Sequence, residues 1–312
     1  MPTHHRGVEP GTVSRRRGPV GHILFDPDGR PRIGWRLVAY LATLALAIAG
    51  VSGLLVGGHP TPFRQIVGLT ASVPIVVAVT YAFRRWVDRR GWDGIGLPSP
   101  RPQHLWQCGA GFTAGVLVIA ALFAVQWAFG WVDVAGTELD DRNAAAVVWV
   151  LAGELAFQLA VGFSEEVGFR GYVFQNLAGT LSVRKAIVAT GVLFGAAHLP
   201  AANSLGSGLT WAVALNTLMG ATLVSSLWVL TRLSTGTLWP AIGMHAAWNW
   251  AETSVFGLAT TAEPGYGNAW LHLRQTGPDL VVGYDVPETG LLFTFAEALL
   301  LGGYLLYVRR RS

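Results

Sequence analysis

Eight long apolar stretches constrain the fold of this 312-residue sequence more than any other feature. A bilayer core about 30 Å thick needs about 20 apolar residues in helical form. Each stretch meets that length within tolerance, so the sequence predicts an all-α fold, a polytopic transmembrane helical bundle of about eight spans. The stretches are 35–57, 64–83, 105–130, 147–177, 184–202, 209–231, 237–257 and 290–308.

The composition also indicates a membrane protein. Hydrophobic residues make up 52% of the chain and charged residues only 13%, whereas about 25% of the residues in soluble domains are charged. The net charge of +4 comes from arginine clusters beside the apolar runs, which favours a lipid bilayer as partner and argues against nucleic acid. Cys108 is the only cysteine, so neither a disulfide nor a cysteine metal cluster can form.

The distribution of basic residues predicts the orientation. Lys and Arg gather in every second connection, and the connections between these are acidic or neutral. Strict alternation then puts all basic clusters on one side, so both termini are expected in the cytoplasm of a multi-pass protein of the cell (plasma or inner) membrane. The clusters are Arg15 to Arg17, Arg84 to Arg90, Arg184 with Lys185, Arg232, and Arg309 to Arg311.

These patterns divide the chain into five parts. Residues 1–32 are expected to form a disordered basic cytoplasmic tail. Residues 33–143 hold the first three helices, and 144–257 hold the next four, which form the core. Residues 258–288 form an extracytoplasmic loop, which is either a mobile exterior segment or a lid. Residues 289–312 form the last transmembrane helix and a basic C-terminus.

The fourth apolar stretch contains ionisable residues in the run SEEVGFR. An ionised side chain at the bilayer centre costs about 2.5 to 3.5 kcal/mol, so such residues usually face the bundle interior and have a role. Glu166 and Arg170 lie on one helix face at i,i+4, which favours an ion pair, while Glu165 points about 100° away from Glu166. One carboxylate can then be neutralised while the other stays available. Glu154 either lines the cavity or, as is favoured, lies near the outer interface.

Two further stretches contribute histidines. His198 ends the string FGAAH in the fifth stretch, and His245 and Asn249 lie at i,i+4 in HAAWN of the seventh. Singly, these residues are typical of packing or interhelical hydrogen bonding. Together with Glu165 they favour hydrolysis, with Glu165 and His198 activating water and His245 and Asn249 stabilising an oxyanion. Alternatively, Glu165, His198 and His245 are of the types that hold zinc, so the metal stays open.

Three strings in order, EEVGFR (165–170), FGAAH (194–198) and HAAWN (245–249), carry a family resemblance. The chain resembles the CPBP intramembrane proteases, which include CAAX prenyl endopeptidases of the Rce1 type and bacteriocin self-immunity proteins. The resemblance implies a CPBP-like catalytic core at 144–257 and a membrane-associated or lipidated protein as substrate. It implies that Glu165 and His198 activate the water, that His245 and Asn249 form the oxyanion hole, and that Glu166 and Arg170 support the site. Both metal-dependent and metal-free mechanisms are proposed for this family.

Other functions remain as alternatives. The chain is a candidate non-catalytic membrane scaffold or bacteriocin self-immunity factor. A transporter is less favoured, because matching halves with broken helices are not visible. A rhomboid-type serine protease is disfavoured by the polar setting of Ser207, and a zincin by the absence of H-E-x-x-H.

The proposed site sets a geometric requirement on the fourth span. A helix that began at Ala144 and ended after about twenty residues would leave Glu165 at the cytoplasmic interface, far from His198. The helix must therefore run on through Gln175, or Ala144 to Leu151 must form a separate interfacial segment. In either case Glu165 is expected close to His198 and His245.

Overall fold

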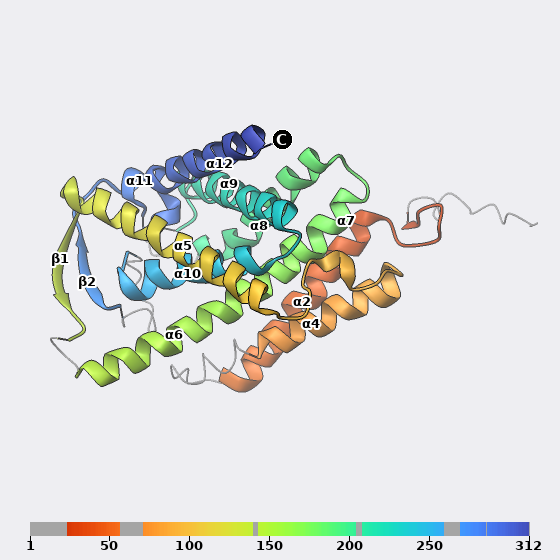
Figure 1. Ribbon diagram of the computed structural model, residues 1–312, viewed down its shortest axis with the longest axis horizontal. Helices are drawn as coiled ribbons and strands as arrows, with labels where there is room; N and C mark the ends of the chain where they lie inside the picture. The colour runs from red at the N-terminus through yellow and green to blue at the C-terminus, as the bar shows by residue number, and fades with distance from the viewer. Residues whose placement is uncertain are drawn as a thin grey trace, which may run out of the picture.

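The computed structural model describes residues 24–56, 71–139, 143–203, 208–258, 269–284 and 286–311. Its described part is a bundle of helices with one small two-stranded sheet at one end (Figure 1). The predicted all-α helical bundle is thereby confirmed. Ser207 and residues 1–23 of the expected tail lie outside the described residues.

Apart from a short helix at 279–282, the described α-helices follow the apolar stretches. They are α2 (Ile33–Val56), α4 (Ser72–Ala82), α5 (Pro102–Ala128), α6 (Ala144–Glu165), α7 (Phe174–Ala178), α8 (Val183–Asn203), α9 (Trp211–Thr235), α10 (Trp239–Trp250), α11 (Asp279–Val282) and α12 (Leu291–Arg311). Short π-helices continue three of them, namely η1 (Phe83–Val87), η3 (Glu166–Val173) and η4 (Ala251–Val255). Two 3-10 turns are η2 (Asp93–Ile95) and η5 (Pro287–Thr289).

Within the described residues, five helical segments are long and apolar enough to cross a membrane, judged by length and composition. They are Ile33–Val51, Pro102–Ala128, Ala144–Ala178, Trp211–Thr235 and Leu291–Arg310. This supports a multi-pass membrane protein. The count of eight, the cytoplasmic termini and the domain boundaries stay predictions. The expected second span begins outside the described residues, since 57–70 are not described.

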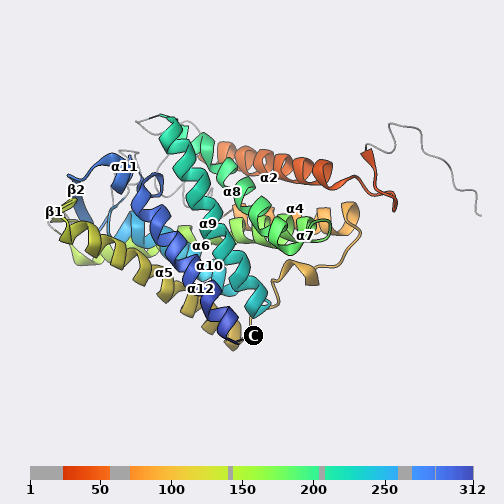
Figure 2. The same ribbon diagram turned by 90° about the horizontal axis from the view of Figure 1, so that it is seen from above.

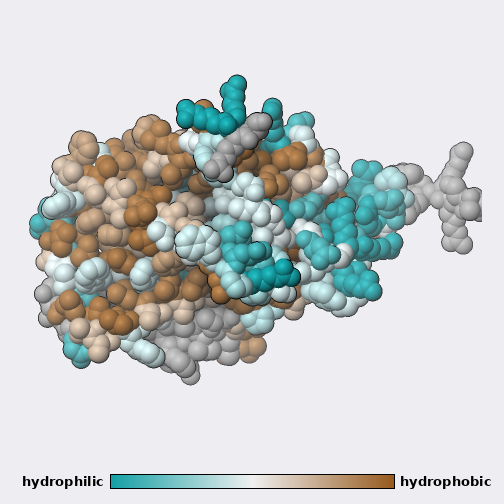
Figure 3. All heavy atoms as spheres, in the orientation of Figure 1, coloured by the Kyte–Doolittle hydropathy of each residue, from teal (hydrophilic) through white to brown (hydrophobic). Residues whose placement is uncertain are grey.

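Exposed tryptophans mark the ends of the apolar surface. On α5, Trp106 and Trp127 are both exposed and lie 21 positions apart in the sequence, which corresponds to about 31 Å of helix. This distance matches the hydrocarbon core of a bilayer, and Trp is enriched at both membrane interfaces. Between such ends, apolar residues cover much of the face over α5 and α6 (Figure 3). Hydrophilic residues gather at the right of the same view, near α7 and the start of α2 (Figure 3).

Helix α10 lies at the centre of the bundle because small residues let its neighbours approach (Figure 2). A Cβ added at Gly111 of α5 would lie 2.0 Å from the Pro240 carbonyl oxygen of α10, and one at Gly243 would lie 2.0 Å from the Cys108 carbonyl oxygen. On the other side, a Cβ at Gly162 of α6 would lie 3.1 Å from the Ala246 nitrogen. Small residues at such spacing are typical of close helix packing in membranes. They bring α10 against both α5 and α6.

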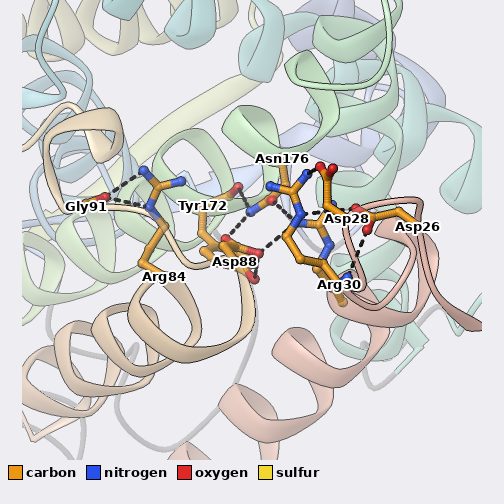
Figure 4. Close-up of polar contacts among 9 residues, drawn as sticks. Asp26, Asp28, Arg30, Arg84, Asp88, Gly91, Tyr172 and Asn176 are labelled. Atoms are coloured by element: carbon orange, nitrogen blue, oxygen red, sulfur yellow. Dashed lines mark hydrogen bonds and ion pairs between the residues drawn. The ribbon is translucent and has the colours of Figure 1, made fainter. Parts of the chain in front are cut away.

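A buried polar network joins the N-terminal helices to the core (Figure 4). Arg36 of α2 pairs with Asp88 at 2.9 Å and donates to Asn176 Oδ1 at 3.1 Å. Asn176 Nδ2 and the Tyr172 hydroxyl also donate to Asp88, at 3.0 and 3.3 Å. Tyr40 of α2 stacks on Tyr172 with ring centroids 3.9 Å apart. The network thus fixes α2 and the end of η1 on η3 and α7.

Part of the segment expected as an extracytoplasmic loop has regular structure. Strand β2 (Leu271–Gln275) pairs antiparallel with β1 (Val132–Thr137), with a register shift between Val134 and Gly136. Helix α11 and the η5 turn follow β2. Residues 259–268 of that segment lie outside the description. No sequence pattern predicted this strand pair.

The close contact of α5 with α10 gives a stability prediction. Gly111→Ala should lower the free energy of unfolding by about 1 to 3 kcal/mol, because the new methyl group overlaps backbone atoms that cannot rotate away. Gly109→Ala on the same helix is the matched control, since a Cβ there meets nothing within 4 Å. Thermal unfolding in detergent measures both. Equal midpoints for the two variants would contradict this packing.

Candidate active site

The segment that carries both glutamates is one unbroken helix. Helix α6 ends at Glu165, the π-helix η3 begins at Glu166, and α7 continues to Ala178. The fourth span therefore runs on past Gln175, which is the first of the two arrangements that the site requires. A π-helical turn inside an α-helix is rare, and the turns that do occur are often found at functional sites.

Glu166 is the buried, paired carboxylate. Its Oε1 atom lies 3.0 Å from Arg170 Nη1, and both side chains are fully buried. The predicted i,i+4 pair is therefore present. The same Oε1 atom also accepts a hydrogen bond of 2.9 Å from His245 Nδ1 on α10, which was not predicted. One carboxylate oxygen thus holds a cation from its own helix and an imidazole from another.

Glu165 is the available carboxylate. Its Oε2 atom lies 3.6 Å from His245 Nε2 and 3.9 Å from His198 Nε2, and it has no hydrogen-bond partner among the described residues. Its side chain is 30% exposed, whereas that of Glu166 is 0% exposed. The structure thus brings Glu165 close to both histidines, as the proposed site required. Arg170 pairs with Glu166 instead of Glu165.

His198 lies on α8 with one nitrogen engaged by its own helix. Its Nδ1 donates to the Phe194 carbonyl oxygen at 2.8 Å, because that carbonyl can only accept. In the neutral imidazole, Nε2 then carries the lone pair, and this is the atom that faces Glu165. The side chain is 41% exposed, so the His198 edge of the site is open.

Asn249 lies near His245, whereas Glu154 lies far from the site. Asn249 lies one turn after His245 on α10, half-buried and on the same face of the helix. Glu154 is half-buried on α6 and lies about 16 Å along the helix from Glu165. This distance separates Glu154 from the cluster of glutamates and histidines.

Aromatic residues enclose the paired groups. The Trp228 ring of α9 stacks on the His245 imidazole, with centroids 4.3 Å apart and planes inclined by 21°. The Arg170 guanidinium carbon lies 4.0 Å from the Phe194 ring centroid and 4.7 Å from that of Trp228. Phe194 belongs to a string singled out in the sequence. No sequence pattern marked Trp228 as a site residue, because its contacts depend on how α9 packs against α10.

The side chains as placed do not fit a preformed metal site. Among the described residues, no group of three or more His, Cys, Asp or Glu is arranged to hold a metal ion. One nitrogen of His245 is engaged by Glu166 and one nitrogen of His198 by the Phe194 carbonyl. The zinc alternative is therefore left to measurement.

The comparisons with known proteins concern this same segment. Residues 144–251 match the family described as type II CAAX prenyl endopeptidase Rce1-like. This segment is similar to that family. The match begins at the first residue of α6 and ends at the first residue of η4, so it includes all six predicted site residues. A comparison with curated proteins found no match. The family supports a hydrolase of the CAAX endopeptidase type with several transmembrane helices.

The unequal settings of the two glutamates predict unequal effects on stability. Glu166→Gln should cost about 3 to 5 kcal/mol, because it leaves Arg170 as an uncompensated buried cation. Glu165→Gln should change the unfolding free energy by less than about 1 kcal/mol, since this partly exposed carboxylate has no ion pair with an arginine. Thermal unfolding of the two isosteric variants measures the difference. A larger loss for Glu165→Gln would contradict the assignment of the buried pair.

Proposed function

We propose that the chain is an intramembrane endopeptidase of the CAAX type that hydrolyses a peptide bond in a membrane-associated or lipidated protein. Its place is the cell membrane, and its catalytic groups are Glu165, His198, His245 and Asn249. The observation that carries the proposal is the position of Glu165. Its Oε2 atom lies within 4 Å of two imidazole nitrogens and has no hydrogen bond to any described residue.

Glu165 and His198 activate the water molecule. A water molecule beside Glu165 Oε2 can also reach His198 Nε2, because the two atoms are only 3.9 Å apart. Glu165 takes a proton from the water as its oxygen attacks the peptide carbonyl carbon. His198 accepts a hydrogen bond from the same water through the lone pair on Nε2, which orients the attacking oxygen.

His245 and Asn249 stabilise the oxyanion. The Nδ1 atom of His245 donates to the Glu166 carboxylate, so its Nε2 atom can donate to an oxyanion only when the imidazole is protonated. The Glu166 carboxylate, which also pairs with Arg170, accepts the Nδ1 hydrogen bond of this imidazolium. The side-chain amide of Asn249, one turn further along α10, offers a second N–H donor on the same face.

Bond cleavage completes the proton balance. The C–N bond of the tetrahedral intermediate breaks, and the proton that Glu165 took from water passes to the leaving nitrogen as it becomes an amine. The hydroxyl from water stays on the new carboxyl terminus. Glu166 and Arg170 do not take part in proton transfer. Their contribution is to hold His245 and to keep positive charge near the site.

The activity prediction uses purified protein and a farnesylated peptide that ends in a CAAX sequence. Glu165→Gln should lower kcat at least about 100-fold, because it removes the general base without removing buried volume. His198→Ala should lower kcat by a similar factor. Glu154→Gln on the same helix is the matched control and should keep wild-type kcat. Loss of activity in the control, or full activity of Glu165→Gln, would contradict the proposed roles.

The metal prediction uses elemental analysis of the purified protein. Zinc should be well below one equivalent per chain and equal in wild type and His198→Ala, because the side chains as placed do not form a metal site. One equivalent of zinc in the wild type that His198→Ala loses would instead assign water activation to a metal held by Glu165 and the histidines.

A further inference from the structure

We infer that Trp228 is a positioning residue of the active site, holding the His245 imidazole in the orientation that directs Nε2 toward Glu165. The inference rests on the proposed function and extends it to a residue outside the three motifs. It follows from the contacts of a single indole ring with both His245 and Arg170.

The contacts of Trp228 leave the imidazole little freedom. Its hydrogen bond from Nδ1 to Glu166 restrains one atom of the His245 ring, but one hydrogen bond alone still permits small rotations about χ1 and χ2. Trp228 covers one face of the ring with centroids 4.3 Å apart, and Phe194 meets it edge-on at 6.2 Å. The stacked indole therefore sets the plane of the imidazole. That plane determines the 3.6 Å separation of Nε2 from Glu165 Oε2.

The same indole also contacts Arg170, the cation that pairs with Glu166. The nitrogens of Arg170 form no hydrogen bond of good geometry among the described residues, although Nη1 lies 3.0 Å from Glu166. The Trp228 and Phe194 rings lie against the guanidinium within cation–π distance. Trp228 thus contacts both partners of the Glu166 carboxylate, and its loss would loosen both.

The aromatic face, rather than a hydrogen bond, is what Trp228 contributes. Its side chain is buried, and its indole Nε1 atom has no hydrogen-bond partner in the described part of the chain. Phenylalanine at this position would keep a flat ring without an unpaired N–H group. Methionine would fill much of the same space without a flat face. These two substitutions separate ring stacking from simple space filling.

The kinetic test compares Trp228→Met with Trp228→Phe on the farnesylated CAAX peptide. Trp228→Met should lower kcat about 10- to 100-fold with KM within about twofold, because a small misplacement of a catalytic group is costly. Trp228→Phe should stay within about threefold of wild-type kcat. Trp211→Met, on the same helix at a side chain 92% exposed, is the control and should not change kcat. In a His245→Ala background, Trp228→Met should lower the residual rate no further.

A spectroscopic test works without turnover. Ring stacking should shift the imidazole proton resonances of His245 upfield, and assignment uses the signals lost in His245→Gln. Trp228→Met should abolish the shift, Trp228→Phe should keep most of it, and Trp211→Met should leave it unchanged. A wild type that cleaves nothing would contradict the proposed function, while the resonances would still test the stacking.

Three results would overturn the inference. The first is wild-type kcat in a folded Trp228→Met variant, and the second is an unchanged His245 resonance in that variant. The third is an equal loss of kcat in the Phe and Met variants, which would point to volume rather than to the aromatic face. If Trp228→Met does not fold, the Phe variant alone decides through its kcat and its resonance.

Discussion

The shared use of one buried carboxylate oxygen is the interaction on which the site depends. Glu166 Oε1 binds Arg170 from its own helix and His245 from α10. Burial of a charge is costly unless a partner compensates it, so this carboxylate can exist in the interior only with Arg170 in place. The pairing also distinguishes two adjacent glutamates of identical chemistry. Glu166 becomes a structural anion, and Glu165 keeps an oxygen free to act on water.

The rest of the bundle holds the elements that make this interaction possible. Close backbone approach at Gly111 and Gly162 places α10 between α5 and α6, which brings His245 to the level of the glutamates. The buried network around Asp88 fixes the N-terminal helices on the turn that follows Arg170. Around Glu166 and around Asp88, buried polar groups hold neighbouring helices together. The apolar surface around them fits a bilayer.

Residues that depend on helix geometry alone were predictable from the sequence. The i,i+4 pair of Glu166 with Arg170 and the separate direction of Glu165 follow from a helical rotation of about 100° per residue. The motif strings predicted that His198 and His245 would meet Glu165. Contacts that depend on tertiary packing were not predictable, namely the bond from His245 to Glu166, the stacking of Trp228 and the pairing of β1 with β2. No local pattern encodes which face of α9 meets α10, and the strands lie more than a hundred residues apart.

The central claim is that the Glu165 carboxylate, which lies beside His198 and His245, makes this membrane protein a protease. The most direct measurement maps new protein termini by mass spectrometry in membranes that contain equal amounts of wild type or Glu165→Gln. Termini that appear with the wild type and vanish with Glu165→Gln are the predicted result. Identical sets of termini in both membranes would contradict the claim and favour a non-catalytic role such as a scaffold or self-immunity factor.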